Sequence, residues 1–336
     1  MSKIIMSIKS FTRNYSHETL LRAVDRRRQR RWTGWIFLIP SAIYFVILLI
    51  GLVKTQSEEI MFDGKNIVIT GGSSGLGKAL AKKLAAKGAR LSLIARDPKK
   101  LASVRQELLG GGPSDAAVDV FPCDVSDNKA VQKAFKALAD KTGAPDILIN
   151  SAGILREGYF ECQSIDTFRE TMDINFFGAL HCIQSALPYF KEKGDGRIVN
   201  ICSVAGLIGV FGYSAYCASK HALRGLTGAL RAELKHQNII VHIVYPAEFE
   251  SPMVDALNAS RTKENKTVAG TIPILSAEAV ADEVIKGIVK NRYEITPGIA
   301  TRILTGFERV FPAAGRLVSD LQVRRVYKGP EKGKRP

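Results

Sequence analysis

The chain has 336 residues, of which 46% are hydrophobic, and a formal net charge of +16. This length is sufficient for one large α/β domain with extensions at its ends. The five cysteines form no C-x-x-C pair, which argues against a disulfide framework or a metal site and favours a reducing compartment. A basic chain can bind nucleic acid or an anionic membrane, but the sequence has no zinc-finger or RNA-binding signature, so we expect no nucleic-acid partner.

The N-terminal part of the chain is predicted to anchor it to a membrane. Residues 1–34 are polar and increasingly basic, whereas residues 35–53 are uncharged and mostly apolar. As a helix, residues 35–53 would be roughly 28 Å long, which is close to the hydrocarbon thickness of a bilayer. We therefore predict a basic tail over residues 1–34, a transmembrane or re-entrant helix over residues 35–53 and a linker over residues 54–61.

The sidedness of this anchor has two readings. An arginine cluster at residues 26–31 favours a cytoplasmic N-terminus, so a single crossing would place the rest of the chain on the opposite side. A bend at Pro40 would return the chain to the cytoplasm. We expect a membrane-anchored protein with its catalytic domain in the cytoplasm, at the inner membrane of a bacterium or the endoplasmic reticulum of a eukaryote. Met61 is an alternative start that would give a form without the anchor.

From Asn66 onward, predicted strands and helices alternate. Apolar β-branched runs predict strands, and longer stretches of helix formers predict helices. The expected strands are residues 67–69, 90–94, 117–121, 146–149, 197–201, 239–244 and 293–296, and the expected helices are residues 78–87, 98–109, 129–140, 165–190, 214–235 and 277–289. This alternation is typical of an α/β fold with a doubly wound parallel sheet of the Rossmann type, which we place over residues 62–297.

The C-terminal region is predicted to contain amphipathic helices over residues 298–325. Ile299, Ile303 and Phe307 fall on one face of a helix. That face either packs on the catalytic domain, where it would cover the substrate cleft, or contacts the membrane, and we favour membrane contact. Residues 326–336 are expected to form a disordered basic tail.

A glycine-rich turn joins the first predicted strand to the first predicted helix. It is formed by Thr70-Gly71-Gly72-Ser73-Ser74-Gly75-Leu76-Gly77. In this arrangement, free backbone N–H groups and the positive end of a helix meet at one point, which suits a pyrophosphate. The absence of Cβ atoms lets the backbone approach the phosphates closely. The alternative reading is an ordinary loop.

Tyr216 and Lys220 are four residues apart in a predicted helix and therefore project from one face. A neighbouring ammonium is expected to lower the pKa of the Tyr216 phenol from its ordinary value of about 10. Tyr216 would then act as a general acid or base near neutral pH. Tyr213 has no lysine four residues later, so we treat it as a decoy. The pattern alone also fits a surface pair on a helix.

Several motifs in a fixed order resemble the short-chain dehydrogenase/reductase family. They are the glycine-rich turn, Asn150-Ser-Ala-Gly153, Ser203, and Tyr216-Cys-Ala-Ser-Lys220. Within that family, the segments 209–220 and 244–252 are most similar to the 3-ketodihydrosphingosine reductases. The resemblance implies a Rossmann fold, reduction of a ketone by a nicotinamide cofactor, and dimers or tetramers.

The resemblance also implies roles for individual residues. Tyr216 would be the acid/base, Lys220 its electrostatic partner and a ribose ligand, Ser203 a hydrogen-bond donor to the substrate oxygen, and Asn175 the holder of a water in the proton relay. The implied cofactor-binding residues are Thr70, Gly71, Ser73, Ser74, Gly75, Leu76, Gly77, Arg96, Asp124, Val125, Asn150, Ala152, Gly153, Tyr216, Lys220, Pro246 and Ser251. No metal site is implied.

The end of the second predicted strand bears on cofactor choice. An acidic residue there would bind the 2′-hydroxyl of NAD, but here Arg96 follows the strand, and a guanidinium suits a 2′-phosphate. Asp97 argues in the other direction. We predict NADPH-dependent reduction of a lipid-like ketone, with conversion of 3-ketodihydrosphingosine to dihydrosphingosine as the favoured reaction. The alternatives are a steroid, retinoid or 3-oxoacyl substrate, and a non-catalytic NADP-binding membrane scaffold.

Overall fold

The computed structural model describes residues 61–111 and 117–327. The predicted basic tail and anchor, and the linker apart from Met61, lie outside these residues. Within the described ranges, no helix combines the length and the hydropathy needed to cross a bilayer. Two residues of the predicted C-terminal tail are described, and they belong to the last helix, which continues to Tyr327.

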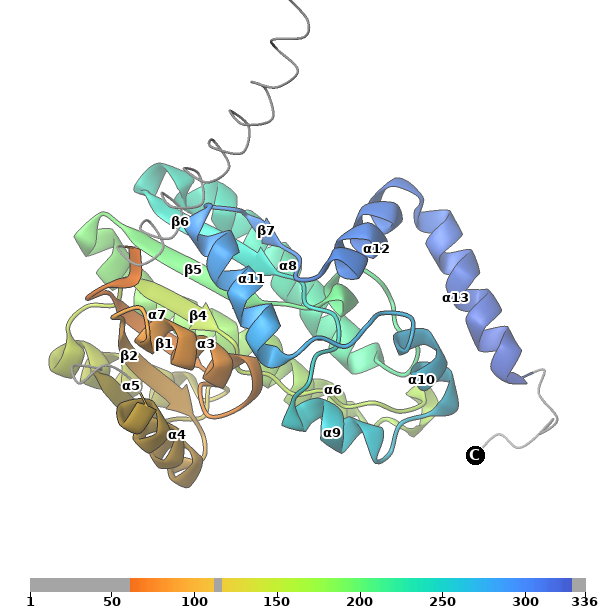
Figure 1. Ribbon diagram of the computed structural model, residues 1–336, viewed down its shortest axis with the longest axis horizontal. Coiled ribbons are helices and arrows are strands. Elements are labelled where there is room, and N and C mark those ends of the chain that lie inside the picture. The colour runs from red at the N-terminus through yellow and green to blue at the C-terminus, as the bar shows by residue number, and fades with distance from the viewer. Residues whose placement is uncertain (1–60, 112–116, 328–336) are drawn as a thin grey trace, which may run out of the picture. The chain divides into compact units, whose positions relative to one another are not determined.

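The core of the fold is one parallel sheet in the order β3-β2-β1-β4-β5-β6-β7 (Figure 1). Every neighbouring pair of strands is parallel. The order reverses between β1 and β4, which makes the sheet doubly wound and places the ligand crevice at the carboxyl ends of these strands. The predicted Rossmann-type fold is therefore confirmed. The strands are β1 (Asn66–Thr70), β2 (Arg90–Ala95), β3 (Val118–Pro122), β4 (Ile147–Asn150), β5 (Gly196–Ile201), β6 (Ile239–Val244) and β7 (Glu294–Ile295).

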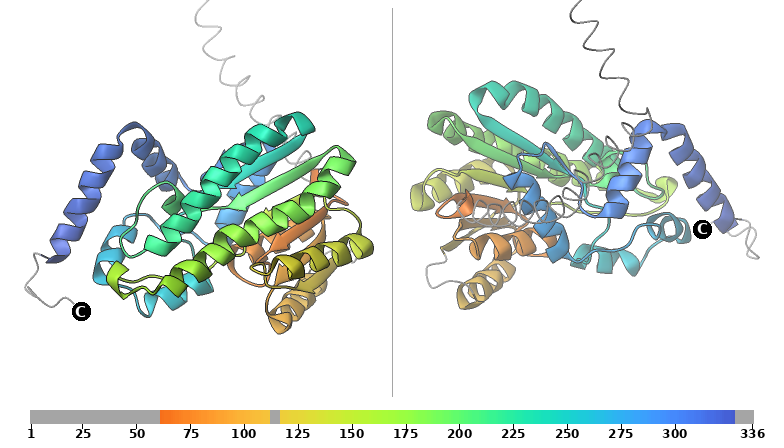
Figure 2. Two further views of the ribbon diagram at one scale, coloured as in Figure 1. Left: turned by 180° about the vertical axis from the view of Figure 1, so that it is seen from behind. Right: turned by 45° about the horizontal axis from the view of Figure 1, so that its top comes forward.

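Helices cover both faces of the sheet, as the two faces of β1 illustrate. Ile67 and Ile69 pack on one side and Val68 on the other, because side chains alternate along a strand. The first side is covered by α3 (Gly75–Ala85), α4 (Pro98–Gly111) and α11 (Ala277–Val289). The second is covered mainly by α5 (Asn128–Thr142) and α7 (Gly178–Lys193), with α8 (Ser214–Leu234) beside them (Figure 2). Burial on both faces explains the uninterrupted apolar runs of the strands.

The helix predicted over residues 165–190 is wrong as a single element. The structure has α6 (Ile165–Met172), a π-helical segment (Asp173–Phe177) and then α7. The π-helical turn contains one extra residue, and such turns are frequent at functional sites. Here it carries Asn175, whose side chain bonds to groups outside the helix.

The first helix also differs from its prediction. It was expected over residues 78–87, but α3 begins at Gly75. Gly75, Leu76 and Gly77 therefore form its first turn, so the glycine-rich turn and the N-terminus of the helix are one structure.

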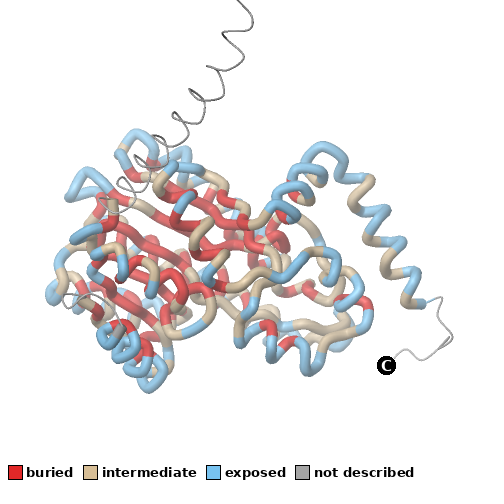
Figure 3. Tube along the Cα trace, in the orientation of Figure 1, coloured by how far each residue is buried: buried red, intermediate tan, exposed pale blue. Residues whose placement is uncertain are grey.

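Four further helices follow β6 in the chain. They are α9 (Pro252–Asn258), α10 (Lys263–Ala269), α12 (Ile299–Val310) and α13 (Pro312–Tyr327). The trace of α12 is mostly pale blue, the colour of exposed residues, in Figure 3. Its inward face is formed by Thr301 and Thr305, which are buried, whereas Ile299 and Ile303 are 74% and 67% exposed. The predicted apolar face of this helix thus points away from the catalytic domain.

Candidate active site

The glycine-rich turn brings the carboxyl end of β1 against the residues that follow β4. Gly71 has a φ of +69°, and a Cβ there would lie 2.8 Å from the Ala152 nitrogen. A Cβ on Gly77 would collide with the carbonyl oxygen of Gly71. Ser74 precedes α3 but its side chain makes no capping hydrogen bond, so the first-turn N–H groups remain available to an anion. This turn fits a dinucleotide pyrophosphate.

Hydrogen bonds below the turn tie the central strands together. Thr70 Oγ1 accepts bonds from the backbone nitrogens of Ser151 and Ala152, both at 3.1 Å. The Asn150 side chain is buried and donates to Asn200 Oδ1 at 2.8 Å. Asn150 is therefore directed into the sheet, and its backbone is the part that can line a cofactor site.

The predicted catalytic residues lie at the carboxyl end of β5 and on α8. Lys220 Nζ lies 5.6 Å from the centre of the Tyr216 ring and donates to the Ile201 carbonyl oxygen at 2.9 Å. Ser203 Oγ lies 3.5 Å from the Pro246 carbonyl oxygen, to which it donates, and it also bonds to the Tyr216 phenol. The structure therefore brings Ser203, Tyr216 and Lys220 into one cluster.

Burial governs the charges of this cluster. It raises the pKa of Tyr216, and the hydrogen bond to Ser203 offsets only part of that increase. It also lowers the pKa of the Lys220 ammonium, which is 5% exposed. The pKa of Tyr216 is therefore raised overall, opposite to the expected lowering by Lys220, because desolvation of the phenolate is the largest influence on it.

Asn175 joins the cluster from the π-helical segment. Its Oδ1 accepts from the Ile154 nitrogen at 2.8 Å, and its Nδ2 donates to the Ile154 carbonyl oxygen at 2.9 Å and to Ser219 Oγ at 3.0 Å. A Cβ on Gly153 would lie 3.1 Å from Asn175 Oδ1 and 3.7 Å from Lys220 Nζ. Asn175 and Lys220 therefore meet at the Asn150–Gly153 motif.

The end of β2 presents Arg96 and Asp97 differently. Arg96 is exposed. One carboxylate oxygen of Asp97 accepts bonds from the backbone nitrogens of Lys99 and Lys100, at 2.9 and 3.1 Å. Asp97 therefore caps α4 through one of its two carboxylate oxygens.

The remaining predicted cofactor residues lie at neighbouring strand ends. Asp124 and Val125 follow β3, and Asp124 Oδ1 accepts from the backbone and hydroxyl of Ser126. Pro246 is buried after β6. Ser251 caps α9, and its Cβ lies 3.6 Å from where a Cβ on Gly75 would stand. These segments therefore converge on the carboxyl edge of the sheet.

Sequence reasoning missed the placement of Tyr213. Its side chain is 4% exposed, its hydroxyl donates to Glu248, and its ring packs edge-on against Tyr216 with centroids 5.7 Å apart. The i, i+3 spacing of the two tyrosines was the only signal available, since three residues bring side chains onto one helix face.

Comparison with known proteins identifies the family of this chain. Residues 65–262 match the family model described as short chain dehydrogenase. The chain belongs to this family. As a short-chain dehydrogenase it is an oxidoreductase that acts on ketone and alcohol groups.

Two relatives and two solved structures illustrate the similarity. The chain is 34% identical to a Bos taurus protein named 3-ketodihydrosphingosine reductase, over 77% of this chain and 79% of the relative. It is 35% identical to a Danio rerio 3-dehydrosphinganine reductase over the same shares. A Burkholderia phymatum short chain dehydrogenase/reductase in complex with NAD superimposes with a TM-score of 0.65, at 26% identity, over 82% of this chain and 99% of that one.

The second structure is a variant of the actinorhodin polyketide ketoreductase with NADPH, which has a TM-score of 0.64 at 25% identity, over 71% of this chain and 97% of that one. One of these structures contains NAD and the other NADPH. They support a nicotinamide cofactor, which the geometry of the glycine-rich turn also fits.

Proposed function

We propose that this short-chain dehydrogenase is a membrane-anchored, NADPH-dependent reductase of a 3-keto sphingoid base, and that it converts 3-ketodihydrosphingosine to dihydrosphingosine. The observation that carries the proposal is the cluster of Ser203, Tyr216 and Lys220 behind the glycine-rich turn, in a chain about one-third identical to reductases named for this ketone. The cluster supports ketone chemistry, and the relatives support the sphingoid substrate.

Each residue has a defined part in the proposed reaction. A nicotinamide held at the glycine-rich turn would supply the hydride for the carbonyl carbon. Ser203 Oγ, whose hydrogen would turn from the Pro246 carbonyl oxygen, and Tyr216 Oη would donate hydrogen bonds to the substrate carbonyl oxygen. The Tyr216 proton would pass to that oxygen as the C=O double bond becomes the C–O single bond of an alcohol. Because burial raises its pKa, Tyr216 is protonated at neutral pH, as a proton donor must be. Lys220 would be the electrostatic partner of Tyr216 and a ribose ligand, and Asn175 would hold a water in the proton relay.

The proposal favours NADPH over NADH. Arg96 can pair in a bidentate manner with a 2′-phosphate. Asp97, the acidic residue beside it, uses one carboxylate oxygen to cap α4.

The proposal includes the membrane, with the catalytic domain on its cytoplasmic side. Two features support the contact with a membrane. The apolar run at residues 35–53 has the length of a bilayer crossing. The exposed face of α12 would add a second contact at the membrane surface. A substrate with a long acyl chain resides in the bilayer, so an enzyme held there meets it directly.

The test is NADPH oxidation by the detergent-purified full chain, offered a long-chain 3-keto sphingoid base beside steroid, retinoid and 3-oxoacyl ketones. Tyr216→Phe is the blank and NADH the cofactor control. Tyr216-dependent turnover that prefers the sphingoid ketone is the expected result. Activity confined to another ketone would keep the chemistry and reject the substrate, and no activity with any ketone would favour a non-catalytic NADP-binding scaffold.

A further inference from the structure

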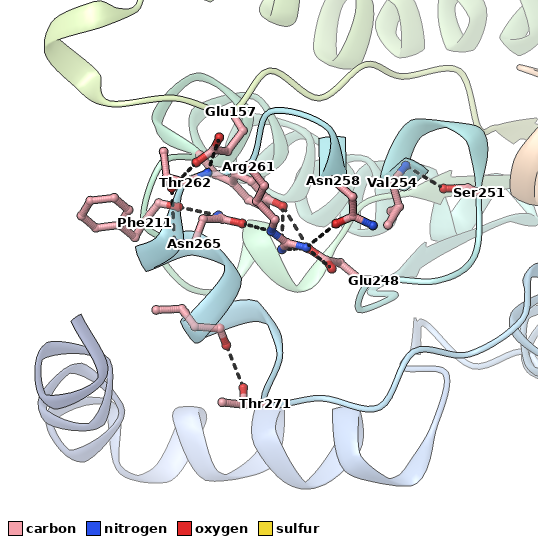
Figure 4. A network of polar contacts seen from close by, with 12 residues as sticks. Glu157, Phe211, Glu248, Ser251, Val254, Asn258, Arg261, Thr262, Asn265 and Thr271 are labelled. Carbon is pink, nitrogen blue, oxygen red and sulfur yellow. Dashed lines mark hydrogen bonds and ion pairs between the residues drawn. The ribbon is translucent and has the colours of Figure 1, made fainter. Parts of the chain in front are cut away.

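A partly buried ion pair connects the segment after β6 to the turn between α9 and α10 (Figure 4). Glu248 and Arg261 are 19% and 7% exposed in their side chains. Arg261 Nη1 donates to one carboxylate oxygen of Glu248 at 3.1 Å, and Nη2 donates to the other. A fork of this kind fixes orientation as well as distance.

Tyr213 is the third member of this group. Its hydroxyl donates to Glu248 Oε1 at 3.0 Å and lies 3.5 Å from Arg261 Nη2. Its ring meets the Tyr216 ring at an interplanar angle of 76°. Tyr213 is therefore held at its hydroxyl by the ion pair and contacts the proposed proton donor with its ring.

A second layer of bonds holds the same loop. Arg261 Nε donates to Asn265 Oδ1, and Asn265 Nδ2 donates to the Phe211 carbonyl oxygen, both at 2.6 Å. Thr262 Oγ1 donates to Glu157 Oε1 at 2.5 Å. The chain that leads into α8 is thus tied to the α9–α10 region both through a side chain and through its backbone.

These contacts bear on a simpler role for Glu248. A carboxylate this close to Tyr216 could serve as the counter-ion of a cationic substrate. Both of its oxygens, however, are already bonded to Arg261, and one also accepts from Tyr213. The carboxylate is therefore already paired with a cation of the protein itself.

We infer that the Glu248–Arg261 pair positions Tyr216 through Tyr213, and that Tyr213 is a positioning residue for the reduction. This inference rests on the proposed role of Tyr216 as proton donor. None of the three residues is assigned to the cofactor, so their loss should act on the chemical step and leave cofactor binding intact.

The test compares two tyrosine-to-phenylalanine variants. Tyr213→Phe removes the hydroxyl bonded to Glu248 but keeps the ring. Tyr159→Phe is the matched control, because Tyr159 also donates to a carboxylate of this region, Glu264 at 3.1 Å, while its ring packs against Phe211. We expect Tyr213→Phe to lower kcat about tenfold with both KM values within twofold, and Tyr159→Phe to leave kcat within twofold.

Glu248→Gln supplies an independent variant of the same contact. It should also lower kcat, and the double variant Tyr213→Phe/Glu248→Gln should fall no further than the lower single variant, because both act through one bond. An unchanged kcat in Tyr213→Phe, an equal loss in Tyr159→Phe, or losses that multiply in the double variant would overturn the inference. Full activity of Tyr216→Phe, measured beside them, would instead reject the proposed function.

Discussion

At the scale of single residues, protonation of Tyr216 is decided by its surroundings. The phenol is half-buried between Ser203 and Tyr213, and burial raises its pKa. Lys220 is itself desolvated, and its ammonium donates a hydrogen bond to the Ile201 carbonyl oxygen. The raised pKa keeps the Tyr216 phenol protonated, which suits a proton donor in reduction.

The raised pKa of Tyr216 can be measured directly. Tyrosinate absorbs at a longer wavelength than neutral tyrosine, so the difference between wild type and Tyr216→Phe isolates one phenol among nine. A raised pKa keeps that phenol protonated as the pH increases, and we expect no ionisation step in the difference below about pH 10. A step near neutral pH in the ligand-free protein would contradict this.

The proposed preference for NADPH also belongs to this scale, because it rests on Arg96. In Arg96→Ser, we expect the KM for NADPH to rise about tenfold, because a hydrogen bond to a charged group contributes about 1.5 kcal/mol or more. The KM for NADH should not change. Arg90→Ser is the matched control, since Arg90 is exposed at the opposite end of the same strand. If Arg96→Ser changed the KM for both cofactors equally, the proposed contact between Arg96 and the 2′-phosphate would be rejected.

At the scale of elements, the turn between β1 and α3 has no room for a side chain at the two glycines that lie closest to other backbone atoms. Gly77 lies in the first turn of α3 and faces the carbonyl of Gly71, while Gly71 faces the backbone of Ala152. A Cβ at either position meets backbone, which cannot move without displacing a strand end.

Gly77→Ala should therefore weaken NADPH binding more than tenfold and lower the free energy of unfolding by about 1–3 kcal/mol. Gly225→Ala in α8 is the matched control, because no atom lies within 4 Å of a Cβ there. It should be neutral or stabilise the protein by up to about 1 kcal/mol. Calorimetric titration and urea unfolding measure the two effects, and wild-type NADPH affinity in Gly77→Ala would show that this turn does not hold the cofactor.

At the scale of the whole molecule, α12 turns its polar side inward and its apolar side outward. Thr301 and Thr305 are buried while Ile303 and Val310 are each 67% exposed. Arg302 and Arg309 pair with Glu283 and Glu294 of the catalytic domain and so fix the rotation of the helix. An apolar stripe held outward in this way is suited to a membrane surface.

This orientation predicts contact between Ile303 and lipid. Ile303→Trp would be made in the full chain with Trp32 and Trp35 replaced by phenylalanine, and reconstituted in vesicles that contain brominated lipid. We expect stronger quenching at this position than in Lys136→Trp, a control on α5 whose side chain is 77% exposed. Equal quenching at the two positions would place α12 in water.

The sequence by itself determined those features that depend on near neighbours in the chain. The apolar runs predicted the strands, and the glycine-rich turn predicted a phosphate site. The four-residue spacing between Tyr216 and Lys220 predicted that they lie on one helix face. Strand alternation, helix pitch and glycine geometry are all local properties of the chain. The order of the motifs was sufficient to indicate the family.

Tertiary structure decided what depends on partners far along the chain. Asn175 acts with Ile154 and Ser219, which lie 21 and 44 residues away, and this departure from α-helical bonding was not visible in the apolar pattern of residues 165–190. The Tyr213 hydroxyl finds its partners in Glu248 and Arg261, which lie 35 and 48 residues later. Burial, which sets the pKa of Tyr216 and the outward face of α12, is a property of packing, and no local pattern contains it.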